Sequence, residues 1–280
     1  MPVERVQKIL ARSGFGSRRS CELLIERGQV TINGEPAHLG SKADQQKDSI
    51  AVNGAAIPKP EPLIYIALHK PRGVLSDEDL NDSRNNVRDL ISIPERLYPV
   101  GRLDLDSEGL VLMTNDGDLA YRLTHPKFGH EKEYRVLVAT RPDEKQLATW
   151  RRGVVLEDGF RTAPAKVEVE SPAGKGIWLR VILNEGRKRQ IREVGRQIGL
   201  PVVKIVRLRI ANLRLGNLKP REWRYLTDEE ISGLKANPDS AVQKKGSIRK
   251  IIHNSGRATR PKRGNARKKT GPVKSSSKSS

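Results

Sequence analysis

Two acidic residues, Asp104 and Asp106, lie in a short segment between Gly101 and Gly109, directly before an apolar run. Residues two apart on a strand face the same side, so this pair could act as a general acid and base. In a loop, the same carboxylates could instead bind the backbone amides of a turn. Because catalytic groups tend to lie on loops held between rigid elements, the segment is a candidate site.

A second candidate segment begins at Glu185-Gly186, where cations crowd the start of a predicted helix: Arg187, Lys188, Arg189, Arg192 and Arg196. Helix N-termini and guanidinium groups both bind phosphate. Arg189 and Arg192 are three apart and share a helix face. The pattern predicts an anion-binding face, with a merely solvated helix face as the alternative.

The sequence lacks the usual patterns for metals and nucleotide cofactors. His125 and His130 lie five residues apart, and no acid or thiol completes a recognisable metal site around them. Glycine-rich nucleotide fingerprints are missing as well. The single cysteine, Cys21, excludes a disulfide framework and a four-thiolate zinc site within one chain. We therefore expect neither a metal nor a cofactor.

The charge balance points to a polyanionic partner. The chain has 53 Lys and Arg against 33 Asp and Glu, and residues 240–280 hold thirteen of these positive charges and no acid. Such a tail cannot collapse through charge pairing, and nucleic acid is its usual partner. No stretch approaches the roughly 20 apolar residues of a membrane span, and the first residues are charged where a signal peptide is apolar. We expect a cytoplasmic monomer that binds nucleic acid and no membrane.

Residues 1–58 are predicted to form a small unit. Apolar residues at helical spacing predict a first helix, and Ser17 is a plausible N-cap for a second helix that ends near Glu26. A strand over residues 29–32 and the Asn33-Gly34 pair predict a hairpin. Arg5, Arg18 and Arg19 on the predicted helices suggest RNA binding, and residues 59–62 form a proline-rich linker.

Residues 63–236 are predicted to form an α+β domain around a mixed or antiparallel sheet. Strands are expected near residues 63–68, 111–114, 133–138, 165–169, 178–183 and 202–208, and helices near 144–151 and 188–198. Thr227 and Glu230 form a capping-box pattern at the start of a last helix. Residues 237–280 contain no aromatic residue and are predicted to be a disordered basic tail.

Four segments in order resemble one known family: His69-Lys70-Pro71-Arg72-Gly73, then Gly101-Arg102-Leu103-Asp104 with Gly109-Leu110 and Thr114-Asn115-Asp116-Gly117, then Lys132-Glu133-Tyr134-Arg135-Val136, and Glu185 to Arg192. They resemble the motifs of bacterial ribosomal RNA pseudouridine synthases of the RsuA/RluB type. Residues 1–58 resemble the S-four RNA-binding fold that usually precedes that catalytic domain. His69 departs from the family pattern, which has Asn, and we expect only local differences in packing there.

The resemblance implies that the protein isomerises a uridine in ribosomal RNA, or in a pre-ribosomal particle, to pseudouridine without a cofactor. Asp104 would be the nucleophile on a flipped-out nucleotide, with attack on the sugar or on the base left open. Tyr134 would lie against the uracil and could move a proton. Arg192, or its neighbour Arg189, would pair with Asp104 and keep it ionised.

Further residues receive supporting roles from the same resemblance. Leu110 and Leu112 are expected to wall the pocket, and Arg102 belongs to the motif around Asp104. RNA phosphates would be held by Arg5, Arg18, Arg19, Arg187 and Lys188. The stretch Glu222-Trp223-Arg224 and the basic tail favour a large-subunit RNA target. A small-subunit RNA target and a non-catalytic RNA-binding ribosome-assembly factor are the alternatives.

Overall fold

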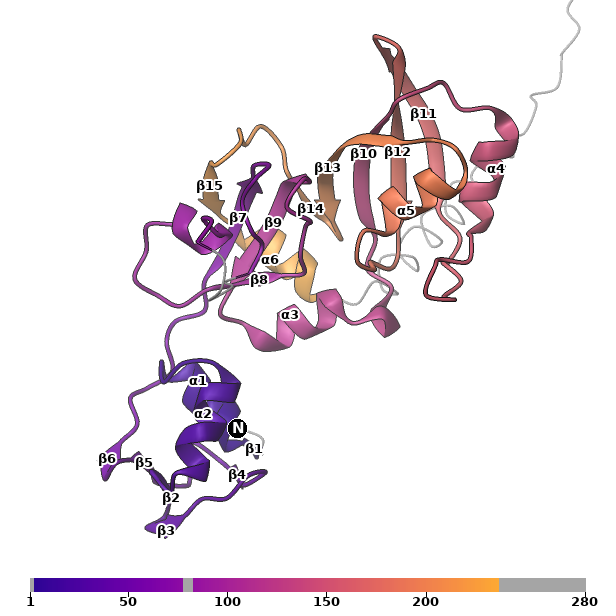
Figure 1. Cartoon of the computed structure of the whole chain (residues 1–280). Coiled ribbons are helices and arrows are strands. Elements are labelled where there is room, and N and C mark those ends of the chain that lie inside the picture. Colours follow the sequence, from indigo (N-terminus) through magenta and orange to yellow (C-terminus); the bar gives the residue numbers. More distant parts are fainter. Residues whose placement is uncertain (1–2, 78–82, 237–280) are drawn as a thin grey trace, which may run out of the picture. The chain divides into compact units, whose positions relative to one another are not determined.

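The computed structural model of the chain describes residues 3–77 and 83–236. The predicted disordered tail, residues 237–280, lies outside the described residues. The chain begins with small helices and strands and continues into an α+β arrangement around a large sheet (Figure 1). Within the described residues, no helix is both long enough and apolar enough to cross a lipid bilayer.

The N-terminal elements are β1 (Glu4–Arg5), α1 (Val6–Arg12), α2 (Arg18–Glu26), β2 (Val30–Ile32), β3 (Glu35–Pro36), β4 (Lys42–Ala43), β5 (Ile50–Val52) and β6 (Ala55–Ala56). Ser17 caps α2 by accepting a hydrogen bond from the backbone amide of Ser20 (3.1 Å), as predicted. Asn33 and Gly34 both have positive φ angles, which a two-residue hairpin turn requires, and they connect β2 to β3.

The second part of the chain contains β7 (Tyr65–Lys70), the 3₁₀ helix η1 (Val87–Leu90), β8 (Tyr98–Val100), β9 (Glu108–Thr114), α3 (Gly117–Thr124), the 3₁₀ helix η2 (Pro126–Phe128), β10 (Lys132–Val138), α4 (Glu144–Arg152), β11 (Lys166–Ala173), β12 (Gly176–Leu183), α5 (Gln190–Gln197), β13 (Val202–Ile210), β14 (Leu213–Arg214), β15 (Trp223–Tyr225) and α6 (Asp228–Lys235). The predicted mixed sheet is confirmed: its strand order is β11-β12-β10-β13-β9-β7-β15, with β14 beside β13 and β8 beside β9.

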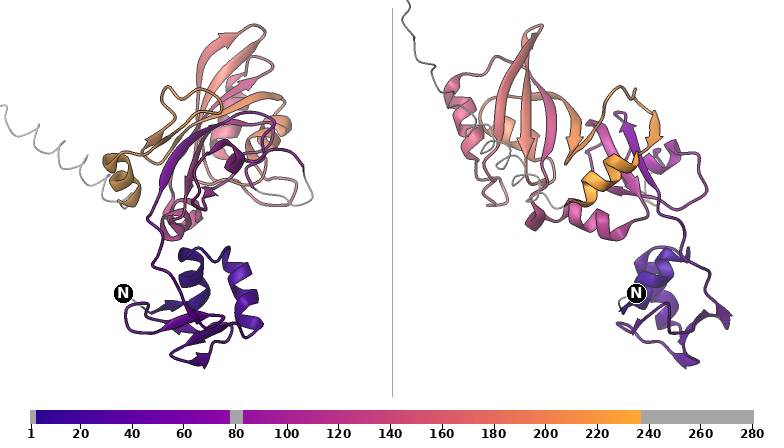
Figure 2. Two further views of the ribbon diagram at one scale, coloured as in Figure 1. Left: turned by 90° about the vertical axis from the view of Figure 1, so that its left-hand side faces the viewer. Right: turned by 180° about the vertical axis from the view of Figure 1, so that it is seen from behind.

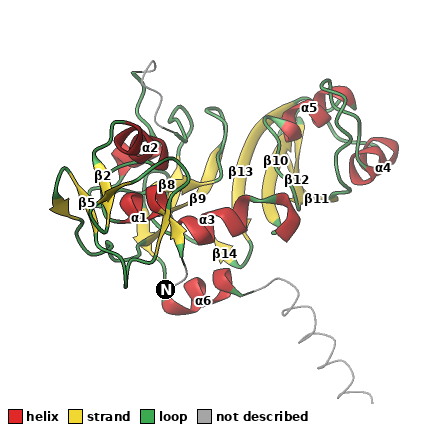
Figure 3. Cartoon of the chain, turned by 90° about the horizontal axis from the view of Figure 1, so that it is seen from below, coloured by secondary structure: helices red, strands yellow, loops and turns green. Residues whose placement is uncertain are grey.

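Side chains alternate between the two faces of this sheet, and different helices cover each face. In β9, Val111 and Met113 pack in one cluster with residues of α4 and α5. Leu110 and Leu112 pack in the other cluster with residues of α3 and α6. Seen from behind, α6 lies across the β7–β9 half of the sheet (Figure 2), and the covering helices are red in Figure 3. β9 is therefore held from both sides.

The helix starts follow from the capping residues. Thr227 and Glu230 form the predicted capping box at the start of α6, each side chain accepting a hydrogen bond from the other residue's backbone amide. The sequence did not predict α3, because Asn115-Asp116-Gly117 is typical of a turn. Asp116 instead caps α3 by accepting hydrogen bonds from the amides of Asp118 (3.1 Å) and Leu119 (3.0 Å). The same short side chain serves turns and N-caps, so both outcomes fit the local pattern.

The two halves of the sheet join where β9 runs parallel to β13. Only two residue pairs are in register there, Glu108 with Val206 and Gly109 with Arg207. Gly109 has a φ of +114°, and a Cβ atom on it would lie 2.4 Å from the backbone oxygen of Arg207. Glycine at this position therefore allows the two strands to approach each other.

We predict that Gly109→Ala lowers the free energy of unfolding by about 3 kcal/mol or more, because it adds both backbone strain and a clash with β13. Gly159→Ala is the matched control: its φ is +82°, but nothing lies within 4 Å of the added atom. The free energy of unfolding of that variant should fall by only about 1 kcal/mol, which is the cost of backbone strain alone. Urea unfolding of both variants measures the difference, and equal losses would contradict the close approach of the strands.

Candidate active site

The segment between β8 and β9, here called the Asp104 loop (residues 102–107), has each of its backbone carbonyl oxygens bound by a donor. Two arginines bind the ends of the loop: Arg207 Nη1 donates to the carbonyl of Arg102 (3.3 Å), and Arg192 Nη2 donates to that of Asp106 (3.1 Å). Lys70 Nζ donates to the carbonyls of Asp104 (3.2 Å) and Ser107 (2.9 Å). The carbonyls of Leu103 and Leu105 accept from Ser76 Oγ (2.6 Å) and from the backbone amide of Gly73 (2.9 Å). A buried carbonyl without a partner costs about 1–3 kcal/mol. This complete set of bonds therefore holds the loop backbone in one conformation.

Lys70, at the end of β7, is completely buried and reaches under the Asp104 loop. Its ammonium group donates to the carbonyls of Pro71 (3.1 Å), Asp104 (3.2 Å) and Ser107 (2.9 Å). Within the described residues, Lys70 forms no ion pair with a carboxylate. Burial lowers the pKa of Lys70 to about 8, although the charge of Asp104 acts in the opposite direction. Carbonyl dipoles thus solvate this cation.

Arg207 in β13 is a second buried cation, with 2% of its surface exposed. Its Nε donates to the carbonyl of Leu110 (2.7 Å) and its Nη1 to that of Arg102 (3.3 Å). The guanidinium group therefore bridges the backbone on both sides of the Asp104 loop, which a lysine ammonium cannot do with the same fixed geometry. Its Nη2 is buried and has no hydrogen-bond partner among the described residues.

The strand register places these cations beside Tyr134. Tyr134 in β10 is paired with Arg207 in β13, Arg207 with Gly109 in β9, and Gly109 with Lys70 in β7. Residues directly opposite one another on neighbouring strands face the same side of a sheet. The side chains of Tyr134, Arg207 and Lys70 thus share one face, and Gly109 leaves its own place on that face without a side chain.

Arg192 binds the Asp104 loop through its backbone. Its Nη1 donates to the carbonyl of Val202 (3.2 Å) and its Nη2 to that of Asp106 (3.1 Å). In the described part of the chain it forms no ion pair with Asp104, contrary to the direct pairing expected from the sequence. Burial, and secondarily the charge of Arg189, lower the pKa of Arg192, while Asp106 and Asp104 act to raise it. Arg189 is exposed and precedes the first turn of α5.

The carboxylate of Asp104 and the hydroxyl group of Tyr134 form no hydrogen bond with any described residue. The carboxylate of Asp104 is half-buried and accepts no hydrogen bond from any described residue. Tyr134 is 7% exposed, and its hydroxyl group also lacks a partner in the described part of the chain. The backbone around Asp104 is thus fixed while its carboxylate stays available for chemistry.

Leu110 and Leu112 do not occupy the positions expected for pocket residues. Leu110 and Leu112 are completely buried in the cluster on the face opposite Tyr134, so they support β9 and do not wall a pocket beside Tyr134. Strand alternation explains this correction, because even-numbered residues of β9 face away from Tyr134. The side chain of Arg102 is exposed and pairs with Asp77 (3.1 Å), while its carbonyl binds Arg207.

The predicted RNA-binding cations are all exposed. Arg5 and Arg18 line a hollow of about 460 Å³ in the N-terminal elements, together with Lys42, whereas Arg19 is not among the lining residues. Arg187 stacks on the ring of Phe160, with 3.8 Å between the guanidinium carbon and the ring centroid. Lys188 makes no ion pair within the described residues.

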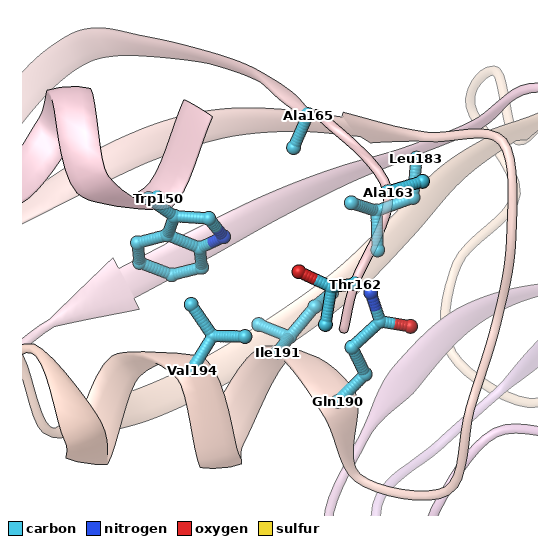
Figure 4. Close-up of a pocket in the computed structure, with 8 residues that line it drawn as sticks. All are labelled: Trp150, Thr162, Ala163, Ala165, Leu183, Gln190, Ile191 and Val194. Atoms are coloured by element: carbon cyan, nitrogen blue, oxygen red, sulfur yellow. The ribbon is translucent and has the colours of Figure 1, made fainter. Parts of the chain in front are cut away.

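A pocket between α4 and α5 is distinct from this site. Trp150, Thr162, Gln190, Ile191 and their neighbours line it (Figure 4), and it has no room for a water molecule. Gln190 donates to Glu185 (2.7 Å). None of the proposed reactive groups lies in its lining, so this pocket reflects how α5, and with it Arg192, packs against α4.

Sequence reasoning missed the roles of Lys70 and Arg207. Lys70 belongs to the first quoted motif, but local sequence does not show that its ammonium lies under the Asp104 loop. Arg207 alternates with Ile205, which lies in a core cluster, and a charge on the buried face of a strand was an available signal. His125 and His130, considered for metal binding, belong to a group of ring contacts instead.

The chain is similar to known RNA pseudouridine synthases along most of its length. A family model described as RNA pseudouridylate synthase matches residues 64–197, and one described as S4 domain matches residues 4–44. The chain is 41% identical over 241 residues to "Ribosomal large subunit pseudouridine synthase B" of Bacillus subtilis (strain 168), covering 85% of this chain and 98% of the relative. It is 36% identical over 274 residues to "Dual-specificity RNA pseudouridine synthase RluF" of Escherichia coli (strain K12), covering 96% and 86%. A solved structure described as "Crystal structure of pseudouridylate synthase" has a TM-score of 0.61 and 31% identity, covering 82% of this chain and 99% of that one.

We predict that two lysines titrate near pH 8, since burial lowers the pKa of both Lys70 and Lys132 to about 8. The folded pKa lies below the ordinary value of 10.5, so the unfolded chain binds more protons between pH 8 and 10.5. The free energy of unfolding should therefore gain a positive pH slope from each lysine across that window.

Side-chain NMR of the lysine Cε and Nζ nuclei checks this titration. Lys132→Met should remove one of the two transitions near pH 8 and leave the transition of Lys70. If both lysines titrated near 10.5 instead, the buried, carbonyl-bound placement of Lys70 would be contradicted.

Proposed function

Because the chain belongs to the RNA pseudouridine synthase family, we propose that it isomerises one uridine of ribosomal RNA to pseudouridine. Large-subunit RNA is the favoured target, since the Bacillus subtilis relative is named for the ribosomal large subunit and matches over most of both chains. The S4 match in the N-terminal elements supports an RNA substrate. Residues 1–58 and 63–236 would serve as the RNA-binding and catalytic domains.

The observation that carries the proposal is the unbound carboxylate of Asp104 on an otherwise fully bonded loop. A nucleophile in a protein must be aimed by its surroundings yet not occupied by them. Here the backbone on both sides of Asp104 is held by Lys70, Arg192 and Arg207, all through carbonyl oxygens.

The reaction needs no atoms beyond the nucleotide. The bond between N1 of uracil and C1′ of ribose breaks, the base turns, and a bond forms between C5 and C1′. The proton on C5 is lost and N1 gains one, so the product is an isomer of the substrate. Asp104 would attack and then leave, at the sugar or at the base. Tyr134, on the same sheet face as Arg207, would lie against the base and move the proton.

The target uridine must leave its stack to reach this site. Extrusion of a base costs a few kcal/mol, which contacts to the surrounding RNA must offset. Arg5, Arg18 and Arg19 on the N-terminal elements and Arg187 and Lys188 before α5 supply exposed cations for RNA phosphates. The thirteen cations of residues 240–280 would add affinity that does not depend on RNA sequence.

We predict that Asp104→Asn lowers the rate of pseudouridine formation by about 10³-fold or more, while RNA affinity stays within a few-fold. The amide keeps the size of the side chain but removes the nucleophile. The assay incubates the protein with transcripts of large-subunit and small-subunit rRNA and maps pseudouridine.

Asp106→Asn is the matched control, because the carbonyl of Asp106, not its carboxylate, contacts Arg192. This variant should keep its turnover within a few-fold of wild type. An Asp104→Asn protein as active as wild type would refute the role of Asp104, and RNA binding without any product from wild type would favour a non-catalytic factor.

A further inference from the structure

An aromatic group at the end of α3 and in η2 has no part in the proposed chemistry. Its members, here called the aromatic patch, are Tyr121, His125, Lys127 and Phe128. Ring centroids lie 5.0 Å apart for Tyr121 and His125, and 6.0 Å apart for Tyr121 and Phe128. The ammonium of Lys127 lies 4.7 Å from the ring centroid of Phe128 and 5.3 Å from that of Tyr121. The patch thus combines ring faces with a cation.

The fold does not need these rings for its core. Leu119 and Leu123 are the residues of α3 that are buried against the sheet. Tyr121 is 51% exposed, His125 and Lys127 are exposed, and Phe128 is only half-buried. The rings contact one another at the end of α3, and Tyr121 presents half of its surface to water, where a ligand can reach its ring.

The charge around the patch fits an anion. Residues 119–130 include Arg122 and Lys127 and no acidic residue. The next acid along the chain, Glu131, already pairs with Lys166 (3.0 Å) and Arg209 (3.0 Å). With Asp118 one turn before Arg122, the charge around the rings is a small positive excess. A surface with ring faces and an excess of positive charge fits the nucleobase and the phosphate of a single-stranded nucleic acid.

The patch lies between the two segments that carry the proposed reactive groups. A Cβ atom on Gly101, the glycine before the Asp104 loop, would lie 3.7 Å from the methyl group of Thr124, the last residue of α3. At its other end, η2 leads through a short connection into β10, whose third residue is Tyr134 (Figure 1). The patch therefore adjoins the start of the Asp104 loop and precedes β10 in the chain, although α3 itself packs against the sheet face opposite Tyr134.

We propose that the aromatic patch stacks an unpaired base of the RNA beside the target uridine, with Lys127 contacting its phosphate. This inference rests on the proposed function, since it takes RNA as the substrate. When one base is extruded, its neighbours lose a stacking partner, and the ring of Tyr121 replaces it. Stacking is tolerant of base identity, so the patch adds affinity for unpaired RNA without setting its sequence.

The test compares Tyr121→Leu with Tyr121→Phe in the full-length chain. Leucine keeps an apolar, helix-compatible side chain against Phe128 but removes the ring face, whereas phenylalanine keeps the ring. The probe is a single-stranded RNA oligonucleotide of about 12 residues carrying 2-aminopurine, with the corresponding duplex as comparison. Tyr225→Leu is the matched control, because Tyr225 is 55% exposed on β15, at the sheet edge next to β7.

Tyr121→Leu should weaken binding of the single strand by about five- to hundred-fold and abolish its quenching of 2-aminopurine fluorescence. Tyr121→Phe and Tyr225→Leu should bind as wild type does, and duplex affinity should not change. Lys127→Ala should reduce the slope of log affinity against log salt by about one, while Tyr121→Leu leaves that slope unchanged.

The proposal is overturned if Tyr121→Leu binds the single strand as tightly as wild type, or if it weakens single-strand and duplex binding equally. The readout is binding and fluorescence, so it does not depend on turnover. Repeating the comparison in an Asp104→Asn background separates the two hypotheses, because base stacking by Tyr121 should persist there whether or not pseudouridine is formed.

Discussion

Buried cations that bind backbone carbonyls, and not carboxylates, are the feature on which the site depends. Taking an ammonium or guanidinium group out of water costs several kcal/mol unless fixed dipoles replace the water. Lys70 and Arg207 meet this requirement through the carbonyls of the Asp104 loop and its ends. Had Asp104 itself been their partner, its carboxylate would be occupied. Because the dipoles of backbone carbonyls stabilise these cations, the carboxylate of Asp104 stays free and the loop stays rigid.

The sheet brings these groups together from segments far apart in the chain. Lys70, Gly109, Arg207 and Tyr134 occupy one row across four strands, and this row includes one of the only two registered pairs between β9 and β13, Gly109 with Arg207. Gly109 makes the row possible in two ways. It lets β9 approach the backbone of β13, and it adds no side chain between the two cations. The junction between the two halves of the sheet and the site are therefore the same structural feature.

Local signals in the sequence predicted much of this structure. The N-cap at Ser17, the hairpin at Asn33-Gly34 and the capping box at Thr227 depend on residues within a few positions, and all three form. The ordered motifs identified the family and singled out Asp104 as the candidate nucleophile. Bounds of strands shifted by a few residues, as for β7, because pairing with β9 and not local propensity decides where a strand ends.

Features set by distant residues could not be predicted in this way. The bond from Arg207 to Arg102 joins residues 105 positions apart, and no local pattern encodes it. Leu110 and Leu112 were assigned to the pocket by their nearness to Asp104 in the chain. A strand, however, turns alternate side chains to opposite faces, and the covering helices decide which face is which. Arg192 was expected at the carboxylate of Asp104, but it donates to the carbonyl of Asp106 in the same loop.

Arg207 thus holds the Asp104 loop by bridging two backbone carbonyls with one rigid guanidinium group. The most direct measurement is the single-turnover rate of pseudouridine formation by Arg207→Lys. This variant keeps the positive charge but loses the planar guanidinium group that donates to two carbonyls at once. We predict a rate lower by about 10²-fold, as expected when a reacting group is displaced by about 1 Å, with RNA affinity unchanged. A folded Arg207→Lys protein with the wild-type rate would contradict it.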